Sequence, residues 1–251
     1  MTHIDEFVMT TPDWQVGLPA DAINALEQFI LDARAALSND LDSIVLFGST
    51  AEGRLRPASD VNLIVVLNRF DDAIVNAWKP ALEVNVAEID LQLMFLLKDE
   101  LREASEASAI RFSDILMRRR VLFGNDPFES LNISREARIH GVQQMLFDLI
   151  LRLRHATLVL DEDGQTHVIV DSIGPLRSIT MVLLQLDGRH VQSPREGFTM
   201  LADQLGTEWC AVIEHLSEMY EQGLVVESNI SHILNRMLAL VTLLYQRSRK
   251  L

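Results

Sequence analysis

The stretch "LFGSTAEGRLRPASDVNLIVV", Leu46–Val66, decides how the first half of the chain is interpreted. It begins at the end of an apolar segment, "DSIVLFG", which predicts a short buried strand that ends at a Gly-Ser turn. After a polar loop, the apolar run "DVNLIVVL" predicts a second strand. The sequence therefore predicts a strand–turn–strand unit with its turn at Gly48 and Ser49 and its second strand opening at Asp60.

The predicted turn carries the groups that an anion needs. Glycine has no Cβ, so the backbone at Gly48 can approach a ligand closely, and a helix after the turn would offer free N–H groups. The hydroxyls of Ser49 and Thr50 add donors, and Arg54 lies in the loop that follows. Arg54 could steady a phosphate, although an arginine in a solvated loop is as readily explained without a ligand.

Acidic residues follow the turn at a spacing that suits a metal. Ten residues separate Ser49 from Asp60, and Asn62 lies on the same face of the predicted strand because side chains alternate. The segment "EVNVAEIDLQLMFL", residues 83–96, also alternates and predicts a strand with Asp90 on its polar face. Asp90 could complete the cluster, and Glu88 on the same face is the alternative.

Together these residues resemble the nucleotidyltransferase family of the polymerase-beta type, over roughly residues 43–95. The family motif is an apolar residue, Gly-Gly or Gly-Ser, a spacer of similar length, then Asp-x-Asp or Asp-x-Glu, and later one more carboxylate on a strand. Gly48, Ser49 and Asp60 match this motif, and Asp90 fits the third carboxylate. Asn62 departs from it, since an amide stands where the family has a second acid.

The resemblance implies a chemistry for each of these positions. Mg²⁺ would be held by Asp60, Asn62 and Asp90, and Asp60 and Asp90 would be the catalytic carboxylates. A nucleoside triphosphate would bind at the turn and loop that contain Gly48, Ser49, Thr50 and Arg54. In the family, the third carboxylate orients or deprotonates the hydroxyl of the acceptor, which the sequence does not identify here.

Asn62 weakens the predicted metal site. A carboxylate offers two charged oxygens that can bridge two ions, whereas an amide offers one neutral oxygen. We therefore expect a nucleotidyltransferase of reduced competence, transferring a nucleoside monophosphate to a hydroxyl. Two alternatives stay open: a catalytically inactive nucleotide-binding pseudoenzyme or sensor, and an antitoxin-like partner of a separate RNase.

The periodicity of the whole chain predicts an α+β fold. Residues 19–37 and 71–83 have helical spacing, and from about Ser134 every apolar stripe has the helical period. We predict a nucleotidyltransferase-type α/β domain with a mixed sheet, residues 1–130, followed by an all-α helical bundle, residues 131–251. Ser228 or Asn229 is the expected N-cap of the last helix.

Composition limits the partners. The chain has 251 residues, with 22 basic and 36 acidic side chains and a net charge of −14, which argues against direct binding to nucleic acid or anionic membranes. The N-terminus lacks a signal-peptide pattern and charges interrupt the apolar runs, so we expect a cytoplasmic protein without a membrane segment. A homo-oligomer or a partner protein is compatible with the sequence.

Four further features have simple structural explanations. The run Arg118-Arg119-Arg120 closes a predicted helix, where cations suit the helix dipole better than they indicate a triphosphate clamp. Arg135 and His140 have the spacing of HEPN-type RNases, but so short a pattern arises easily by chance. Cys210 is predicted to lie in the core, and the acidic run 161–163 is predicted to be a solvated turn.

Overall fold

The structure, a computed structural model of the 251-residue chain, describes residues 13–53, 61–88, 91–222 and 229–251. Arg54, Asp60 and Asp90 of the predicted site lie outside these residues. The chain divides into two compact units. The sheet unit comprises Met1–Leu101 and Arg118–Leu131, and the helical unit comprises Arg102–Met117 and Asn132–Leu251.

The sheet unit is built on a mixed sheet of four strands in the order β3-β2-β1-β4. β1 runs antiparallel to both β2 and β4, whereas β2 and β3 run parallel. The predicted α+β fold class with a mixed N-terminal sheet is thereby confirmed. The strands are β1 (Leu41–Phe47), β2 (Val61–Leu67), β3 (Leu91–Leu97) and β4 (Arg119–Phe123).

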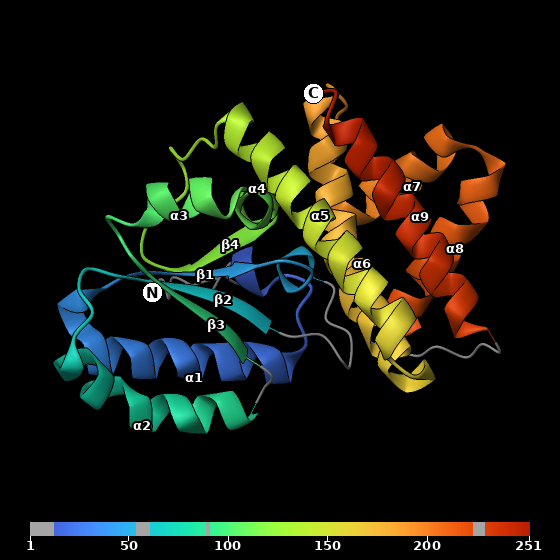
Figure 1. Ribbon diagram of the computed structural model, residues 1–251. Coiled ribbons are helices and arrows are strands. Elements are labelled where there is room, and N and C mark those ends of the chain that lie inside the picture. Colours follow the sequence, from blue (N-terminus) through green and yellow to red (C-terminus); the bar gives the residue numbers. More distant parts are fainter. Residues whose placement is uncertain (1–12, 54–60, 89–90, 223–228) are drawn as a thin grey trace, which may run out of the picture. The chain divides into compact units, whose positions relative to one another are not determined.

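Two helices, α1 (Ala20–Leu37) and α2 (Asp72–Glu88), lie side by side against one face of the sheet (Figure 1). α1 buries one stripe at helical spacing, including Leu26 and Phe29, against alternate residues of β1 and β2. Trp78 of α2 is also buried there, with its ring centroid 5.7 Å from that of Phe29. The helices predicted at 19–37 and 71–83 are therefore present.

The boundary between α2 and β3 differs from the prediction. The helix continues to Glu88 and the strand begins only at Leu91, so the strand predicted from residue 83 is wrong over its first six residues. The segment "EVNVAE" alternates, but six alternating residues are too few to distinguish a strand from the end of a helix. Glu88 is the last residue of α2, and Asp90 lies outside the described residues, so the choice of the third carboxylate stays a prediction.

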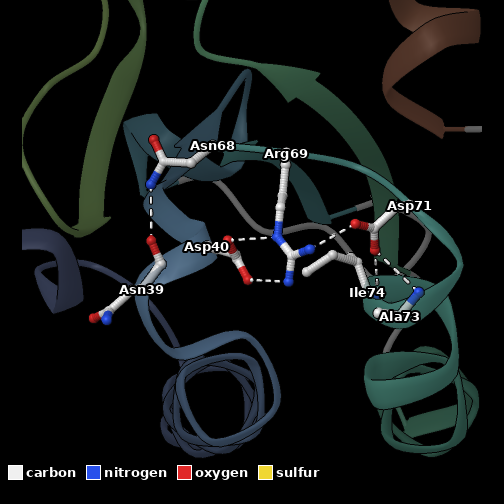
Figure 2. Close-up of polar contacts among 7 residues, drawn as sticks. All are labelled: Asn39, Asp40, Asn68, Arg69, Asp71, Ala73 and Ile74. Atoms are coloured by element: carbon white, nitrogen blue, oxygen red, sulfur yellow. Dashed lines mark hydrogen bonds and ion pairs between the residues drawn. The ribbon is translucent and has the colours of Figure 1, made fainter.

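A polar network closes the end of the sheet where β1 begins and β2 ends (Figure 2). Arg69 donates to both carboxylate oxygens of Asp40, at 2.9 and 3.0 Å, and to Asp71 at 2.7 Å. Asn68 donates to the carbonyl of Asn39 at 2.9 Å. Asp71 also accepts two backbone N–H groups at the start of α2, at 3.0 and 3.1 Å. This Arg69 network ties the two connections together at the surface.

The helical unit is all α-helix apart from its connections within the described residues, as predicted for residues 131–251; it also includes Arg102–Met117, which the prediction had placed in the first domain. Its core is formed chiefly by buried side chains of α5, α6 and α9, together with α7 and α8. Asn229, one of the two predicted caps, accepts the N–H of His232 at 3.1 Å. The helices are α3 (Leu101–Ala107), α4 (Ala109–Met117), α5 (Arg135–Val159), α6 (Glu162–Leu186), α7 (Pro194–Leu205), α8 (Thr207–Gln222) and α9 (Ile230–Ser248).

Among the described residues, one helix, α6, is long and apolar enough to cross a membrane by length and composition alone. Within its apolar window, 61% is buried inside the protein. Its buried side chains, such as Ile173 and Leu183, belong to the core of the helical unit. Such burial is what the central helix of a bundle shows, because it is apolar on most of its surface.

Candidate functional site

The predicted turn at Gly48 is a compact loop that starts where β1 ends. Gly48 has φ +78°, a conformation that glycine adopts without steric cost. Ser49 precedes a single 3₁₀ turn, η3 (Thr50–Glu52), which closes at Gly53 with φ +76°. Instead of the α-helix expected after Ser49, the chain thus forms one short turn, whose Gly53 N–H donates to the Thr50 carbonyl at 3.0 Å. We call this loop the Gly48–Gly53 turn.

The side chains of the turn are not equally accessible. Ser49 is half-buried, so its hydroxyl lies near the surface of the turn. Thr50 is fully buried, with 0% of its surface exposed. This burial argues against the predicted role of the Thr50 hydroxyl as a phosphate donor in this conformation.

Asn62 lies beside the turn. It is the second residue of β2 and pairs with Phe47, the last residue of β1. Its side-chain nitrogen lies 3.8 Å from the position that a Cβ would occupy at Gly48. The structure therefore brings together two predicted site residues, Gly48 and Asn62, which are separated by a whole loop in the sequence.

The three arginines at 118–120 do not close a helix, which corrects the prediction. α4 ends at Met117, and Arg119 and Arg120 begin β4. The carbonyl of Arg118 accepts the N–H of Gly48 at 3.1 Å. Its guanidinium pairs with Glu52 at 3.2 Å, and the two side chains are only 13% and 20% exposed. Arg118 thus holds the turn from both of its ends.

The other two arginines anchor neighbouring segments. Arg119 pairs with Asp126 at 2.7 Å. Burial raises the pKa of Asp126, but hydrogen bonds from Arg119 and a backbone N–H outweigh it and hold the pKa below its ordinary value of 3.8. Arg120 donates to the carbonyls of Trp14 and Val16. All three arginines therefore have protein partners, which does not support the triphosphate clamp.

The segment around Gly17, which Arg120 contacts through hydrogen bonds, packs against Gly53 of the turn. A Cβ built at Gly17 would lie 3.3 Å from the Cα of Gly53, so the two glycines let the backbones approach closely. Gly17 also has a positive φ, of +80°. β4 thus supports the turn both directly and through the segment around Gly17.

The register of β2 and β3 bears on the predicted metal site. Val61 pairs with Leu91 and Asn62 pairs with Gln92 in the parallel ladder. Asp60 and Asp90 directly precede Val61 and Leu91 in the sequence. Across the part of the chain that the structure describes, no group of three or more His, Cys, Asp or Glu could hold a metal. Asp60 and Asp90 lie outside the described residues, so the predicted metal site stays a prediction.

The remaining residues from the sequence lie in the helical unit. Arg135 begins α5 and donates to the carbonyl of Leu251 at 3.3 Å, while His140 is exposed. Asp161 caps α6 by accepting the N–H of Gly164 at 3.0 Å, which gives the acidic run at 161–163 a structural role. Cys210 is partly buried against the helical core, and its thiol donates to the Ala202 carbonyl at 3.4 Å.

Comparison with known proteins now adds to this geometry. Residues 27–120 match the family model described as "Nucleotidyltransferase domain". This part of the chain is similar to nucleotidyltransferase domains. The match contains the Gly48–Gly53 turn, Asn62 and the three arginines, so the family resemblance noted in the sequence is confirmed. A search of curated protein sequences found no match.

A solved structure shares the fold over most of the chain. The crystal structure of spectinomycin adenyltransferase AAD(9) from Enterococcus faecialis with ATP and spectinomycin matches with a TM-score of 0.60. The identity is 17%, and the match covers 90% of this chain and 99% of that one. At this identity the likeness shows the fold alone.

Two residues at the site of the nucleotidyltransferase domain were missed from sequence. Glu52 lies within the motif spacer, where the motif specifies no residue, and the sequence around Arg118 predicts a helix end. They are 66 positions apart, so no local pattern connects them. The sequence contains one signal for this pair, the charged Glu52 inside a turn flanked by glycines. A charged group needs a partner when it is buried.

Proposed function

We propose that this chain is a nucleotidyltransferase that moves a nucleoside monophosphate from a nucleoside triphosphate to a hydroxyl of an acceptor. The observation that carries the proposal is the placement of Asn62 beside the Gly48–Gly53 turn, at the start of β2. The parallel register supports it further, because it aligns the two residues that follow Asp60 and Asp90.

The donor set fits magnesium. Two carboxylates and one amide oxygen are hard ligands of the kind that Mg²⁺ takes together with substrate phosphates. Asp60, Asn62 and Asp90 would hold the ion, with less negative charge than three carboxylates provide. When bound, Mg²⁺ supplies neutralisation of the charge on the triphosphate and on the departing pyrophosphate.

Other residues of the chain bind the triphosphate and remove the proton of the acceptor. The half-buried Ser49 and the backbone next to it bind the β- and γ-phosphates, since the N–H groups of Gly48, Glu52 and Gly53 already donate to backbone carbonyls. Asp90 takes the proton of the acceptor hydroxyl while that oxygen bonds to the α-phosphorus. The bond from the α-phosphorus to the bridging oxygen breaks, and pyrophosphate leaves.

The donor and acceptor can be narrowed for testing. ATP is the first nucleotide to test, because the structurally similar adenyltransferase was crystallised with ATP. A small hydroxylated molecule is the proposed acceptor class, since that neighbour holds spectinomycin as well. Spectinomycin therefore heads an acceptor panel for this chain.

A second function, nucleotide sensing, is favoured by Asn62 itself. Its neutral amide lies beside the turn, in the strand position where the family motif has an acid. Such a site could bind nucleotide carried with one metal ion and still transfer nothing, because a two-metal arrangement needs bridging carboxylates. The sensor and the enzyme share the same binding site and differ only in turnover.

Two measurements separate these functions. Isothermal calorimetry with each nucleoside triphosphate, with and without Mg²⁺, measures binding, and α-labelled ATP with the acceptor panel measures transfer. Binding with transfer supports the enzyme, and binding without transfer supports the sensor. No heat and no thermal shift at millimolar nucleotide would exclude both.

A further inference from the structure

We infer that the ion pair between Glu52 and Arg118 is a positioning element that fixes the Gly48–Gly53 turn in its ligand-binding shape. Neither residue belongs to the family motif quoted above, and neither is proposed to touch the nucleotide. The inference rests on the proposed function for the identity of the ligand. The effect on the shape of the turn stands on the contacts alone.

The contacts form a closed ring. The Gly48 N–H donates to the Arg118 carbonyl at 3.1 Å, and the Arg118 guanidinium pairs with Glu52 at 3.2 Å. The Glu52 N–H in turn donates to the Ser49 carbonyl at 3.1 Å, and Ser49 follows Gly48 in the chain. A single residue, Arg118, directly before β4, therefore contacts the first and the fifth residue of the turn. Breaking the ion pair opens this ring at one point.

Burial makes this ion pair matter more than a surface pair. The side chains of Arg118 and Glu52 are 13% and 20% exposed, so water screens their attraction only partly. Removing one partner takes a contacting opposite charge away from a partly buried side chain, which costs more than the pair contributes when both are present. We expect the turn to shift so that the remaining side chain is better hydrated.

The ion pair could affect the binding of a polyanionic ligand through the shape of the turn or through its charge, and these two roles predict different results. Glu52 places a negative charge on the turn that is proposed to bind a triphosphate, and Arg118 neutralises it. If only charge mattered, removing Glu52 alone would strengthen nucleotide binding, and removing both charges would leave binding unchanged. If the pair fixes the shape, each of these changes weakens binding.

Three variants test this difference: Glu52→Gln, Arg118→Gln and the double variant. Arg119→Gln is the matched control, because it removes the neighbouring arginine, whose partner is Asp126 rather than the turn. Hydrogen exchange of the Gly48, Glu52 and Gly53 amides in the nucleotide-free protein reports the shape of the turn. Calorimetry with ATP and Mg²⁺ reports binding.

We expect all three variants to speed exchange of these amides and to weaken ATP binding by about tenfold, as for disruption of a coupled pair. The control should change neither. Arg118→Lys keeps the charge with a different geometry. Its amide exchange rates and its affinity for ATP should lie between those of wild type and Arg118→Gln. This variant still tests the inference if Arg118→Gln does not fold.

Three results would overturn the inference: unchanged exchange in both single variants, tighter binding by Glu52→Gln, or wild-type binding by the double variant. If the wild-type chain binds no nucleotide, the proposed function fails. In that case the exchange measurement still decides whether the pair fixes the turn.

Discussion

The two ends of the β1–β2 pair are each closed by an arginine and a carboxylate, but in different surroundings. At the end with Gly48, Arg118 pairs with Glu52 at 3.2 Å, and the side chains are 13% and 20% exposed. At the opposite end, Arg69 donates to Asp40 and Asp71, and the side chains of Arg69 and Asp40 are 54% and 28% exposed. The ion pair at the Gly48 end is therefore the more buried of the two.

This difference in burial affects what each ion pair contributes to stability. An exposed ion pair contributes little, because water competes for both partners and holding long side chains costs entropy. A half-buried pair has fewer competitors, and losing one partner is costly. The Arg69 network therefore links two connections at the surface, whereas the Arg118 pair fixes the geometry of a turn.

The largest expected effect comes from an acid at the Gly48 end. Asp60→Asn should lower any transfer rate about a thousandfold, ~4 kcal/mol in the activation free energy, because it removes a charged metal ligand. Asp40→Asn makes the same chemical change at the other end and should leave transfer unchanged. The measurement is the rate with α-labelled ATP. Equal losses in the two variants would mean that the Gly48 end has no special role.

The next effect concerns the amide at the start of β2. Asn62→Asp should tighten Mg²⁺ binding and raise transfer tenfold or more, since it restores a second charged oxygen with almost no change in volume. The matched control is Asn68→Asp, just beyond the other end of β2, which loses a hydrogen bond to the Asn39 carbonyl. Mg²⁺ titration followed by the transfer assay checks both variants.

The thermal stability of Asn62→Asp sharpens this prediction. Without metal the variant should be slightly less stable, because carboxylates that share a site repel one another, and Mg²⁺ should reverse the loss. A variant that gains neither metal affinity nor transfer would show that Asn62 is not the only difference from a working catalyst. The nucleotide sensor would then be the better description.

A third prediction concerns the backbone at Gly48. Gly48→Ala should destabilise the fold by about 1 kcal/mol, because alanine is strained at its φ of +78°. It should also weaken ATP binding, since the new methyl group would lie beside the Asn62 side chain, 3.8 Å away. Gly188→Ala carries the same strain at φ +78° with nothing within 4 Å. The unfolding temperature should fall by a similar amount in both variants, whereas the affinity for ATP measured by calorimetry should fall only in Gly48→Ala.

The smallest effect is expected from pH at the exposed end. The hydrogen bond from Arg69 holds the pKa of Asp40 below its ordinary value of 3.8. A carboxylate with a lowered pKa stabilises the folded state above that value, and this stability is lost as the pH falls further. The melting temperature of wild type should exceed that of Asp40→Asn slightly at neutral pH, and the gap should close below pH 3.8. A constant gap at all pH values would contradict the prediction.

Much of the sheet unit could be predicted from the sequence because its signals are local. Apolar runs bounded by Gly48 and Asp60 indicate two strands, and helical spacing indicates α1 and α2. The end of α2 could not be placed, since "EVNVAE" fits both a helix end and a strand. The role of Arg118 depends on Glu52, which is 66 positions away, and no short pattern predicts such a pair. Asp60 and Asp90 remain sequence-based assignments.

The order of the two units along the chain has a consequence for how the protein is made. The chain leaves the sheet unit after Leu101, returns at Arg118 and leaves again after Leu131. During synthesis, the Gly48–Gly53 turn therefore emerges long before β4 exists to hold it, and α3 and α4 emerge before α5. A fragment ending at Leu101 would lack the strand that closes the turn, and one ending at Leu131 would carry two helices without their unit. No single cut in the gene therefore yields both units whole.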